Sequence, residues 1–352
     1  MKIVTSLSNG GWSKILIEML HSLAASVKKN SPKSELFCLT DIEDTSIFPD
    51  NCNVLRHKLS ILPHLDKINY KYVWNAEMAV GAFFRTEIPL IAEEMKWEDK
   101  CVLYLDADTV VLRDIEHLTE WFEENDVKYF AATTDFKRGD WATFNSGVML
   151  LNLAGMKETY DDFMDYCKKI NFEPEDGVVD QGLYNEFYKD KWSRLSETYN
   201  IKAFWEIFPE EKPYIVHFQG PKPQHILGEM QMIDIYDYHA VNNKYSFLHA
   251  IQWDSEFRVK KPDNRNSTDR EQIDFELVKI FLTRQEEYAR KAHEQLEGYK
   301  KHVKKQDELM EAFKNRISWK ITEPLRVMNK LYGKTKGKIK EKIKEKIKEK
   351  MK

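Results

Sequence analysis

From Met1 to about His249, strand-like and helix-like segments alternate along the chain. The segment "KIVTSLS" predicts a first strand, and the apolar spacing of "WSKILIEMLHSLAASVKK" predicts a helix after it. Further strands are predicted in "SELFCLTD", "CNVLRHKL", "CVLYLDADTVVL", "KYFAATTD", "SGVMLLNL" and "YIVHFQG", and further helices in "NAEMAVGAFFRTEIPLIAEEM" and "YDDFMDYCKKI". This alternation is typical of an α/β protein with one central, mostly parallel sheet covered by helices.

The formal net charge of -4 conceals an uneven distribution. Residues 334–352 contain ten lysines and three glutamates and contribute +7, so residues 1–333 carry -11. Because the positive charge is confined to one short segment, the composition argues against a general nucleic-acid-binding protein.

The cellular compartment is indicated by the absence of paired-cysteine motifs, membrane spans and a signal peptide from the sequence. The four cysteines, Cys38, Cys52, Cys101 and Cys167, show no CxxC or CxxH spacing, which argues against a zinc site or a disulfide framework. No apolar run reaches the length of a membrane span, and "MKIVTSLSNGG" is too short for a signal peptide. We therefore expect a cytosolic protein.

The C-terminal part of the sequence differs from the rest in composition and in the spacing of its apolar residues. We expect a catalytic domain over residues 1–255, a polar linker over 256–271, a long helix over 272–317 and a basic tail over 318–352. Apolar residues recur at alternating three- and four-residue steps from Val278 to Ile317, which indicates either a self-associating coiled coil or a helix docked on the chain's own domain. The repeat "KIKEKIKEKIKEKMK" is consistent with a solvated charged helix, or with an amphipathic helix lying on the anionic inner face of a membrane.

Two carboxylates interrupt the apolar stretch "CVLYLDADTVVL". In a parallel sheet, ligands collect outside the carboxyl ends of the strands, and Asp106 and Asp108 follow such a strand. Residues i and i+2 of an extended chain point the same way, so both carboxylates can converge on one ion. A hard divalent cation, which also recruits substrate phosphates, would account for both charges; two solvated carboxylates in a turn are the alternative.

Three later motifs also place polar side chains at the edges of apolar segments. They are "FNSGVMLLNL" from Phe144, "VDQGLYNEFY" from Val179 and "VHFQGPKP" from Val216. Within them, Asn145 and Ser146 can bond hydroxyl groups, and Asp180 and Gln181 open a helix-like run. His217 is a candidate third metal ligand, and Lys222 is a point charge suited to phosphate.

The ordered set "YLDAD", "FNSGVMLLNL", "DQGLYN" and "HFQGPKP" resembles family 8 of the glycosyltransferases, which includes glycogenin and bacterial lipooligosaccharide galactosyltransferases. The similarity covers roughly residues 1–225. The resemblance implies a glycosyltransferase A-type, Rossmann-like fold and transfer of a sugar from a nucleotide-sugar donor, UDP-linked, to a glycan or lipid-linked acceptor.

The resemblance also implies roles for individual residues. The metal ion, Mn²⁺ or Mg²⁺, is expected on Asp106, Asp108 and His217. Gly220 and Lys222 match residues that hold the diphosphate, and Gln181 matches the position beneath the anomeric carbon. The remaining implied donor contacts are Thr5 and Ser6 for the nucleoside, Asn145, Ser146 and Asp180 for the sugar, and Arg85 on the helix before the metal motif.

The chain departs from the family pattern HFxGxxKPW. His217 and Lys222 are five residues apart instead of six, and Gln224 replaces the tryptophan. The amide of Gln181 is a poor nucleophile, so we expect retention of configuration by a front-face displacement, with Asp180 as the alternative nucleophile or sugar anchor.

Three other functions stay open at this point. They are a catalytically weak scaffold that acts through its coiled coil, a self-glycosylating enzyme, and a nucleotidyl transferase, which also uses paired aspartates and a divalent ion.

Overall fold

The computed structural model describes residues 1–9, 13–65, 76–175, 179–208, 210–227 and 243–258, together with isolated helical positions at 301, 304–306, 308 and 341. The chain divides into two compact units, Met1–Arg284 and Gln285–Lys352. The predicted linker beyond residue 258, the predicted coil and the tail lie outside the described residues, apart from those isolated positions. Within the described residues, no helix is both long and apolar enough to cross a membrane.

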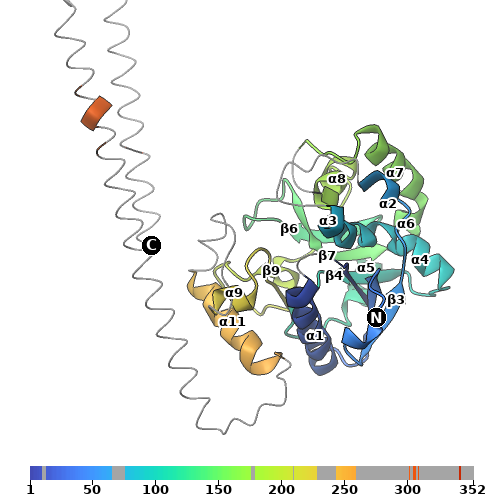
Figure 1. The fold of residues 1–352 in the computed structure, drawn as a ribbon, viewed down its shortest axis with the longest axis horizontal. Helices are drawn as coiled ribbons and strands as arrows, with labels where there is room; N and C mark the ends of the chain where they lie inside the picture. The colour runs from blue at the N-terminus through green and yellow to red at the C-terminus, as the bar shows by residue number, and fades with distance from the viewer. Residues whose placement is uncertain are drawn as a thin grey trace, which may run out of the picture. The chain divides into compact units, whose positions relative to one another are not determined.

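The first unit is built on a seven-stranded, mostly parallel sheet, as the sequence predicts (Figure 1). Its strands pair in parallel except on both sides of β7, where β4 and β6 run antiparallel to it. In spatial order the strands are β3 (Cys52–Arg56), β2 (Glu35–Thr40), β1 (Lys2–Leu7), β4 (Cys101–Leu105), β7 (Phe144–Asn152), β6 (Phe130–Thr134) and β8 (Ser193–Arg194).

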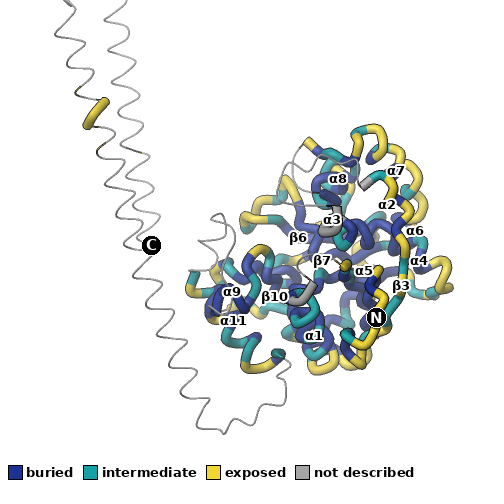
Figure 2. Tube along the Cα trace, in the orientation of Figure 1, coloured by how far each residue is buried: buried dark blue, intermediate teal, exposed yellow. Residues whose placement is uncertain are grey.

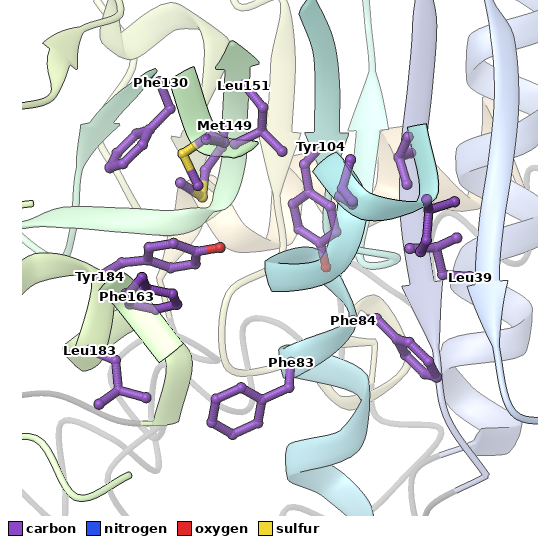
Figure 3. Close-up of a cluster of buried hydrophobic side chains, with 14 of the residues drawn as sticks. Leu39, Phe83, Phe84, Tyr104, Phe130, Met149, Leu151, Phe163, Leu183 and Tyr184 are labelled. Carbon is purple, nitrogen blue, oxygen red and sulfur yellow. The ribbon is translucent and has the colours of Figure 1, made fainter. Parts of the chain in front are cut away.

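Helices cover both faces of this sheet because its central strands are apolar on both sides. Along β4, Val102 and Tyr104 join one hydrophobic cluster, whereas Leu103 and Leu105 join the other. The helices α1 (Ser13–Asn30) and α5 (Leu118–Glu124) pack on the second cluster. The opposite face carries α3 (Ala76–Phe83), α4 (Ile88–Glu94), α6 (Leu153–Glu158), α7 (Tyr160–Lys169) and α8 (Val179–Phe187), whose buried side chains belong to the same hydrophobic cluster as Tyr104 and Met149. Figure 3 shows Phe83, Phe163 and Tyr184 among the residues of this cluster. Buried residues follow the strands, while exposed residues gather at helix ends and loops (Figure 2).

A second, three-stranded sheet was not expected, because the predicted strands were assigned to one central sheet. It contains β5 (Thr109–Val111), β10 (Ile215–His217) and β9 (Ile201–Lys202), in that order. It packs against α9 (Pro223–Ile226), α11 (Lys244–Glu256) and the outer side of α1. The stretch "CVLYLDADTVVL" therefore spans two sheets, and the two carboxylates lie at the junction between them.

The helix predicted over residues 75–95 is divided by a 3-10 turn, η2 (Phe84–Glu87). Pro89 lacks the N–H that would bond the carbonyl of Arg85 four residues earlier, so Ile88 N–H bonds that carbonyl instead. Arg85, within this turn, is buried. The remaining short elements are η1 (Thr45–Ile47), α2 (Leu62–Leu65) and η3 (Glu197–Tyr199).

Candidate active site

The turn between β4 and β5 holds the predicted metal ligands. Thr109 N–H donates to the Asp106 carbonyl at 3.1 Å, and Phe218 N–H donates to the Asp108 carbonyl at 3.0 Å. The two carboxylates thus converge through a turn that carries the chain from one sheet to the other, and not through the i, i+2 alternation of an extended strand. Antiparallel pairing of β5 with β10 then brings His217 opposite Thr109.

One oxygen of each carboxylate faces His217, whereas the other oxygen accepts hydrogen bonds from neighbouring side chains. Nε2 of His217 lies 3.7 Å from Asp106 Oδ2 and 3.2 Å from Asp108 Oδ1. Asp106 Oδ1 accepts hydrogen bonds from Arg85 Nη2 and Tyr104 Oη, both at 2.9 Å. Asp108 Oδ2 accepts from Lys222 Nζ at 2.5 Å.

These three side chains fit a divalent cation. Their ligand atoms all lie within 4.8 Å of one another. Nδ1 of His217 donates to Asn200 Oδ1 at 3.0 Å, which leaves a lone pair on Nε2. Three acceptor atoms that face one another repel in the absence of a positive charge, and a cation bound by oxygen and imidazole ligands would remove that repulsion.

The absence of a side chain at Gly147 allows His217 and Asp106 to approach each other. A Cβ at this position would lie 2.3 Å from His217 Cε1 and 2.6 Å from Asp106 Oδ2. The register between β6 and β7 shifts here, pairing Ala132 with Met149 but Thr133 with Asn145. The irregularity carries Gly147 away from β6 while its carbonyl still accepts from Asp106 N–H at 2.7 Å.

Arg85 joins the metal motif to α8. Its Nε lies 3.0 Å from Asp180 Oδ2 and donates to the Ala82 carbonyl at 3.1 Å, while Nη1 donates to the Ser146 carbonyl. Burial raises the pKa of Asp180 to about 6, although the charge of Arg85 opposes that shift. Burial would also raise the pKa of Asp108, but the charge of Lys222 holds it well below its usual range.

Lys222 contacts the metal motif despite the shortened spacing of its own motif. Its ammonium donates to Asp108, to the Phe218 carbonyl at 2.9 Å and to the Gly220 carbonyl at 2.8 Å. Gly220 has a φ of +81°, which turns the loop back on itself. Gln224, at the position of the family's tryptophan, is buried and donates to Glu18 on α1 at 2.9 Å.

A second cluster of polar groups adjoins the metal motif. Gln181 Oε1 accepts from Asn145 Nδ2 at 2.9 Å and from Ser146 N–H at 3.1 Å. Asp135 was not predicted, yet it binds three amides at its two oxygens: Asn145 at 3.2 Å, Gln219 at 3.1 Å and Gln181 at 3.0 Å. Asp135 directly follows the buried strand β6 as Asp106 directly follows β4, so the same sequence signal could have found it.

Two further residues that the sequence analysis missed support this cluster. Asn200 accepts from His217 and donates to Asn145 Oδ1 at 2.9 Å, so it connects the two halves of the site. Lys202 on β9 pairs with His217 in the ladder and is fully buried. Burial lowers the pKa of Lys202 to about 7, although the nearby carboxylates of Asp135, Asp106 and Asp108 oppose that shift.

The end of β1 is linked to the metal motif by Tyr104, whose hydroxyl contacts both Ser6 and Asp106. Ser6 Oγ bonds Tyr104 Oη at 2.9 Å and donates to the Gly81 carbonyl at 2.8 Å. Thr5 is buried, and its Oγ1 has no hydrogen-bond partner among the described residues. Apart from Thr5, the predicted site residues of all four motifs and of β1 are joined by hydrogen bonds and ion pairs into one region.

Comparison with known proteins identifies the family. A family model described as glycosyl transferase family 8 matches residues 17–225, more than half of the chain. The chain belongs to this family.

Among its relatives, the glycosyltransferase GlyB of Streptococcus pneumoniae is 27% identical over 181 residues, which cover 45% of this chain and 42% of GlyB. A glycogenin of Cryptococcus neoformans is 30% identical over 173 residues, covering 43% of this chain and 18% of the glycogenin. The crystal structure of apo-form GlyE from S. pneumoniae shares 21% identity, covers 75% of this chain and 65% of that chain, and gives a TM-score of 0.47. The matched region spans less than half the length of GlyB and less than half the length of the glycogenin.

Proposed function

We propose that this family 8 protein transfers a sugar from a UDP-linked donor to a glycan or lipid-linked acceptor, with retention of configuration and with Mn²⁺ or Mg²⁺ as cofactor. The observation that carries the proposal is the convergence of Asp106, Asp108 and His217, each with one ligand atom turned inward and its opposite side held by a neighbour. The catalytic unit in this proposal extends over residues 1–255.

The cation would neutralise the charge that develops on the departing diphosphate. In the protein, Arg85 and Tyr104 fix the orientation of Asp106, and Asn200 fixes the ring of His217. Preorganised groups of this kind stabilise charge without having to rearrange during the reaction.

We assign Lys222 to the diphosphate. Its ammonium is placed at the metal motif by Asp108 and by two carbonyls of its own loop, including that of Gly220. A lysine on a short loop can exchange a carbonyl for a phosphate oxygen without moving the strands, because the loop begins after β10 has ended. Thr5 and Ser6 at the end of β1 are assigned to the nucleoside.

Gln181 and Asn145 are assigned to the donor sugar, with Asp135 as an additional anchor. The Gln181 amide is bonded at both ends and is a poor nucleophile. Asp180 is engaged with Arg85, so its proposed role is to hold Arg85 rather than to attack the anomeric carbon. A front-face displacement that retains configuration agrees with both assignments.

The test uses hydrolysis of nucleotide sugars in the absence of acceptor. UDP-glucose, UDP-galactose, UDP-N-acetylglucosamine and GDP-mannose are incubated with the protein in Mn²⁺ and in chelator. We expect slow, metal-dependent release of nucleotide from one donor, and its loss in Asp108→Ala but not in Asp162→Ala, which removes an exposed carboxylate on α7. Undiminished release by Asp108→Ala would refute the metal site, and silence with every donor would favour the scaffold alternative.

The C-terminal segments need a separate test. We propose that the basic tail of residues 318–352 contacts anionic membrane surfaces and that residues 278–317 associate between copies of the chain. Deletion of residues 333–352 should reduce sedimentation with phosphatidylserine-containing liposomes while leaving donor hydrolysis nearly unchanged. Equal sedimentation with and without the tail contradicts the membrane contact.

A further inference from the structure

One carboxylate on α1 joins three segments that lie far apart in the sequence. Glu18 Oε2 accepts a hydrogen bond from Gln224 Nε2 on α9 at 2.9 Å, and Glu18 Oε1 accepts one from Arg258 Nε at 2.7 Å. Arg258 lies just beyond the end of α11. Apolar side chains of α1, α9 and α11 belong to one hydrophobic cluster (Figure 1). Glu18 is therefore a polar link between helices that otherwise pack through apolar side chains.

Gln224 belongs to the same helical turn as Lys222. Lys222 is the N-cap of α9, its N–H donates to His225 Nδ1 at 3.0 Å, and its carbonyl accepts from the N–H groups of His225 and Ile226. A helix of four residues has little stability of its own, so contacts with other elements must fix its position. The bond from Gln224 to Glu18 is therefore also a restraint on the backbone of Lys222.

This restraint matters because the loop between β10 and α9 is short. Residues 218–221 alone separate His217, at the end of β10, from Lys222, one residue fewer than in the family pattern. From this loop the Lys222 ammonium reaches Asp108 and also bonds two carbonyls of the loop itself. Because so short a loop cannot absorb a shift of α9, such a shift would carry the ammonium away from the metal motif.

The amide of Gln224 is buried with only one end satisfied. Its Oε1 has no hydrogen-bond partner among the described residues. A buried acceptor without a partner lowers stability relative to an apolar side chain of the same size. A leucine would fill the same space without that loss, so the donor end of the amide, which bonds Glu18, is what distinguishes glutamine at this position.

Arg258 holds Glu18 from the other side. Its Nη1 donates to Asp254 Oδ1 at 3.0 Å, and its guanidinium lies 5.0 Å from the centroid of the Trp253 ring. The side chains of Glu18 and Arg258 are 33% and 22% exposed, so water screens their attraction only in part. The carboxylate that receives the Gln224 amide is thus itself fixed in orientation.

We propose that Glu18, held by Arg258, is a positioning residue for Lys222. Through Gln224 it fixes α9, and α9 fixes the loop that presents the Lys222 ammonium to the diphosphate of the donor. The proposal rests on the proposed function, in which Lys222 binds that diphosphate.

The experiment compares two ligands. Mn²⁺-dependent binding of UDP is measured by calorimetry, and binding of uridine, which lacks the diphosphate, is measured by saturation-transfer NMR. Gln224→Leu removes the donor to Glu18, and Gln224→Glu places two carboxylates against each other. The double variant Glu18→Gln/Gln224→Glu restores the hydrogen bond with its direction reversed.

Two further proteins separate positioning from general stability. Gln252→Leu is the matched control, because Gln252 also donates to a carboxylate, that of Glu256 at 3.1 Å, but does so within α11. Lys222→Ala removes the ammonium itself and provides the background in which Gln224→Leu is measured a second time.

We expect Lys222→Ala to weaken UDP binding by about tenfold or more, and Gln224→Leu and Gln224→Glu to weaken it by about three- to tenfold. Uridine should bind all variants within about twofold of the wild type, because the restraint acts on the diphosphate contact alone. The double variant should recover UDP affinity to within about threefold of the wild type, and Gln252→Leu should match it. In the Lys222→Ala background, Gln224→Leu should have no further effect, since its influence passes through Lys222.

Three results would overturn the positioning role. They are UDP binding by Gln224→Leu within about twofold of the wild type, equal losses of UDP and uridine binding, and a full additional loss when Gln224→Leu is combined with Lys222→Ala. Failure of the proposed function has a different signature, which is normal UDP binding by Lys222→Ala or no Mn²⁺-dependent UDP binding by the wild type; either would remove this inference as well.

Discussion

Replacing Gly147 by alanine adds one methyl group against two of the candidate metal ligands, His217 and Asp106. The new Cβ would lie 2.3 Å from His217 Cε1, 2.6 Å from Asp106 Oδ2 and 3.0 Å from His217 Nδ1. Carbon atoms in contact are ordinarily about 3.5 Å apart, so His217 or the strand must move by about 1.2 Å. Neither neighbour is free to yield, because Asn200 holds the imidazole and Arg85 holds the carboxylate.

Two effects follow from this displacement. Overpacking of a buried site costs about 1–3 kcal/mol of unfolding free energy. Displacement of a metal ligand or of its supporting partner lowers metal affinity by about 10- to 100-fold. We therefore expect Gly147→Ala to be folded but destabilised, with Mn²⁺ affinity reduced by at least tenfold.

The assay pairs this variant with a second glycine whose substitution causes a clash elsewhere. A Cβ at Gly155, on α6, would lie 1.9 Å from the Lys128 carbonyl oxygen, far along β7 from the site. Urea unfolding should show destabilisation of both variants. Calorimetric titration with Mn²⁺ in the presence of UDP should show weakened binding for Gly147→Ala alone.

The outcome that refutes the reasoning is a Gly147→Ala protein that binds Mn²⁺ within about twofold of the wild type. Equal weakening in Gly155→Ala would also refute it, because the loss of affinity would then follow from destabilisation in general.

Two buried ionisable groups give predictions about pH. Asp180 has its pKa raised to about 6 by burial, so it stabilises the fold while protonated, and that contribution of about 3 kcal/mol is lost as pH rises from about 4 through 6. Asp180→Asn should remove this dependence from urea-unfolding curves recorded between pH 4 and 7; identical slopes in the two proteins contradict the assignment. Burial lowers the pKa of Lys202 to about 7 in the folded protein. Between pH 7 and about 10.5 the unfolded chain therefore binds more protons at this lysine than the folded chain does. The unfolding free energy of the wild type should rise with pH over that range, by up to about 5 kcal/mol relative to that of Lys202→Met. A constant difference in unfolding free energy between these two proteins from pH 7 to 10 would show that Lys202 keeps its ordinary pKa.

The central sheet could be predicted because its signal is local. Apolar runs such as β1 and β4 are bounded by turns, and α1 repeats its apolar residues at helical spacing, so each element is visible in a short window. The second sheet was missed for the same reason. Its strands have only two or three residues each, and nothing local distinguishes them from extensions of the longer strands or from loops.

The candidate site divides in a similar way. The metal motif and His217 carry their chemistry in their residue types, and the sequence therefore identified them as ligand candidates. The close approach of these ligands depends on Gly147. Its importance is visible only once the side chains of His217 and Asp106 lie within 3 Å of the position that a Cβ would occupy.

The sequence by itself determined the order of the elements, the carboxylates at the end of β4 and the family to which the chain belongs. Only the tertiary structure decided that Asp135 gathers three amides, that Asn200 joins the two halves of the site and that Lys202 is buried beside them. The physical reason is that hydrogen bonding and burial depend on partners from distant segments, such as β6, β9 and α8, whereas strand and helix propensity depend on neighbours in the chain.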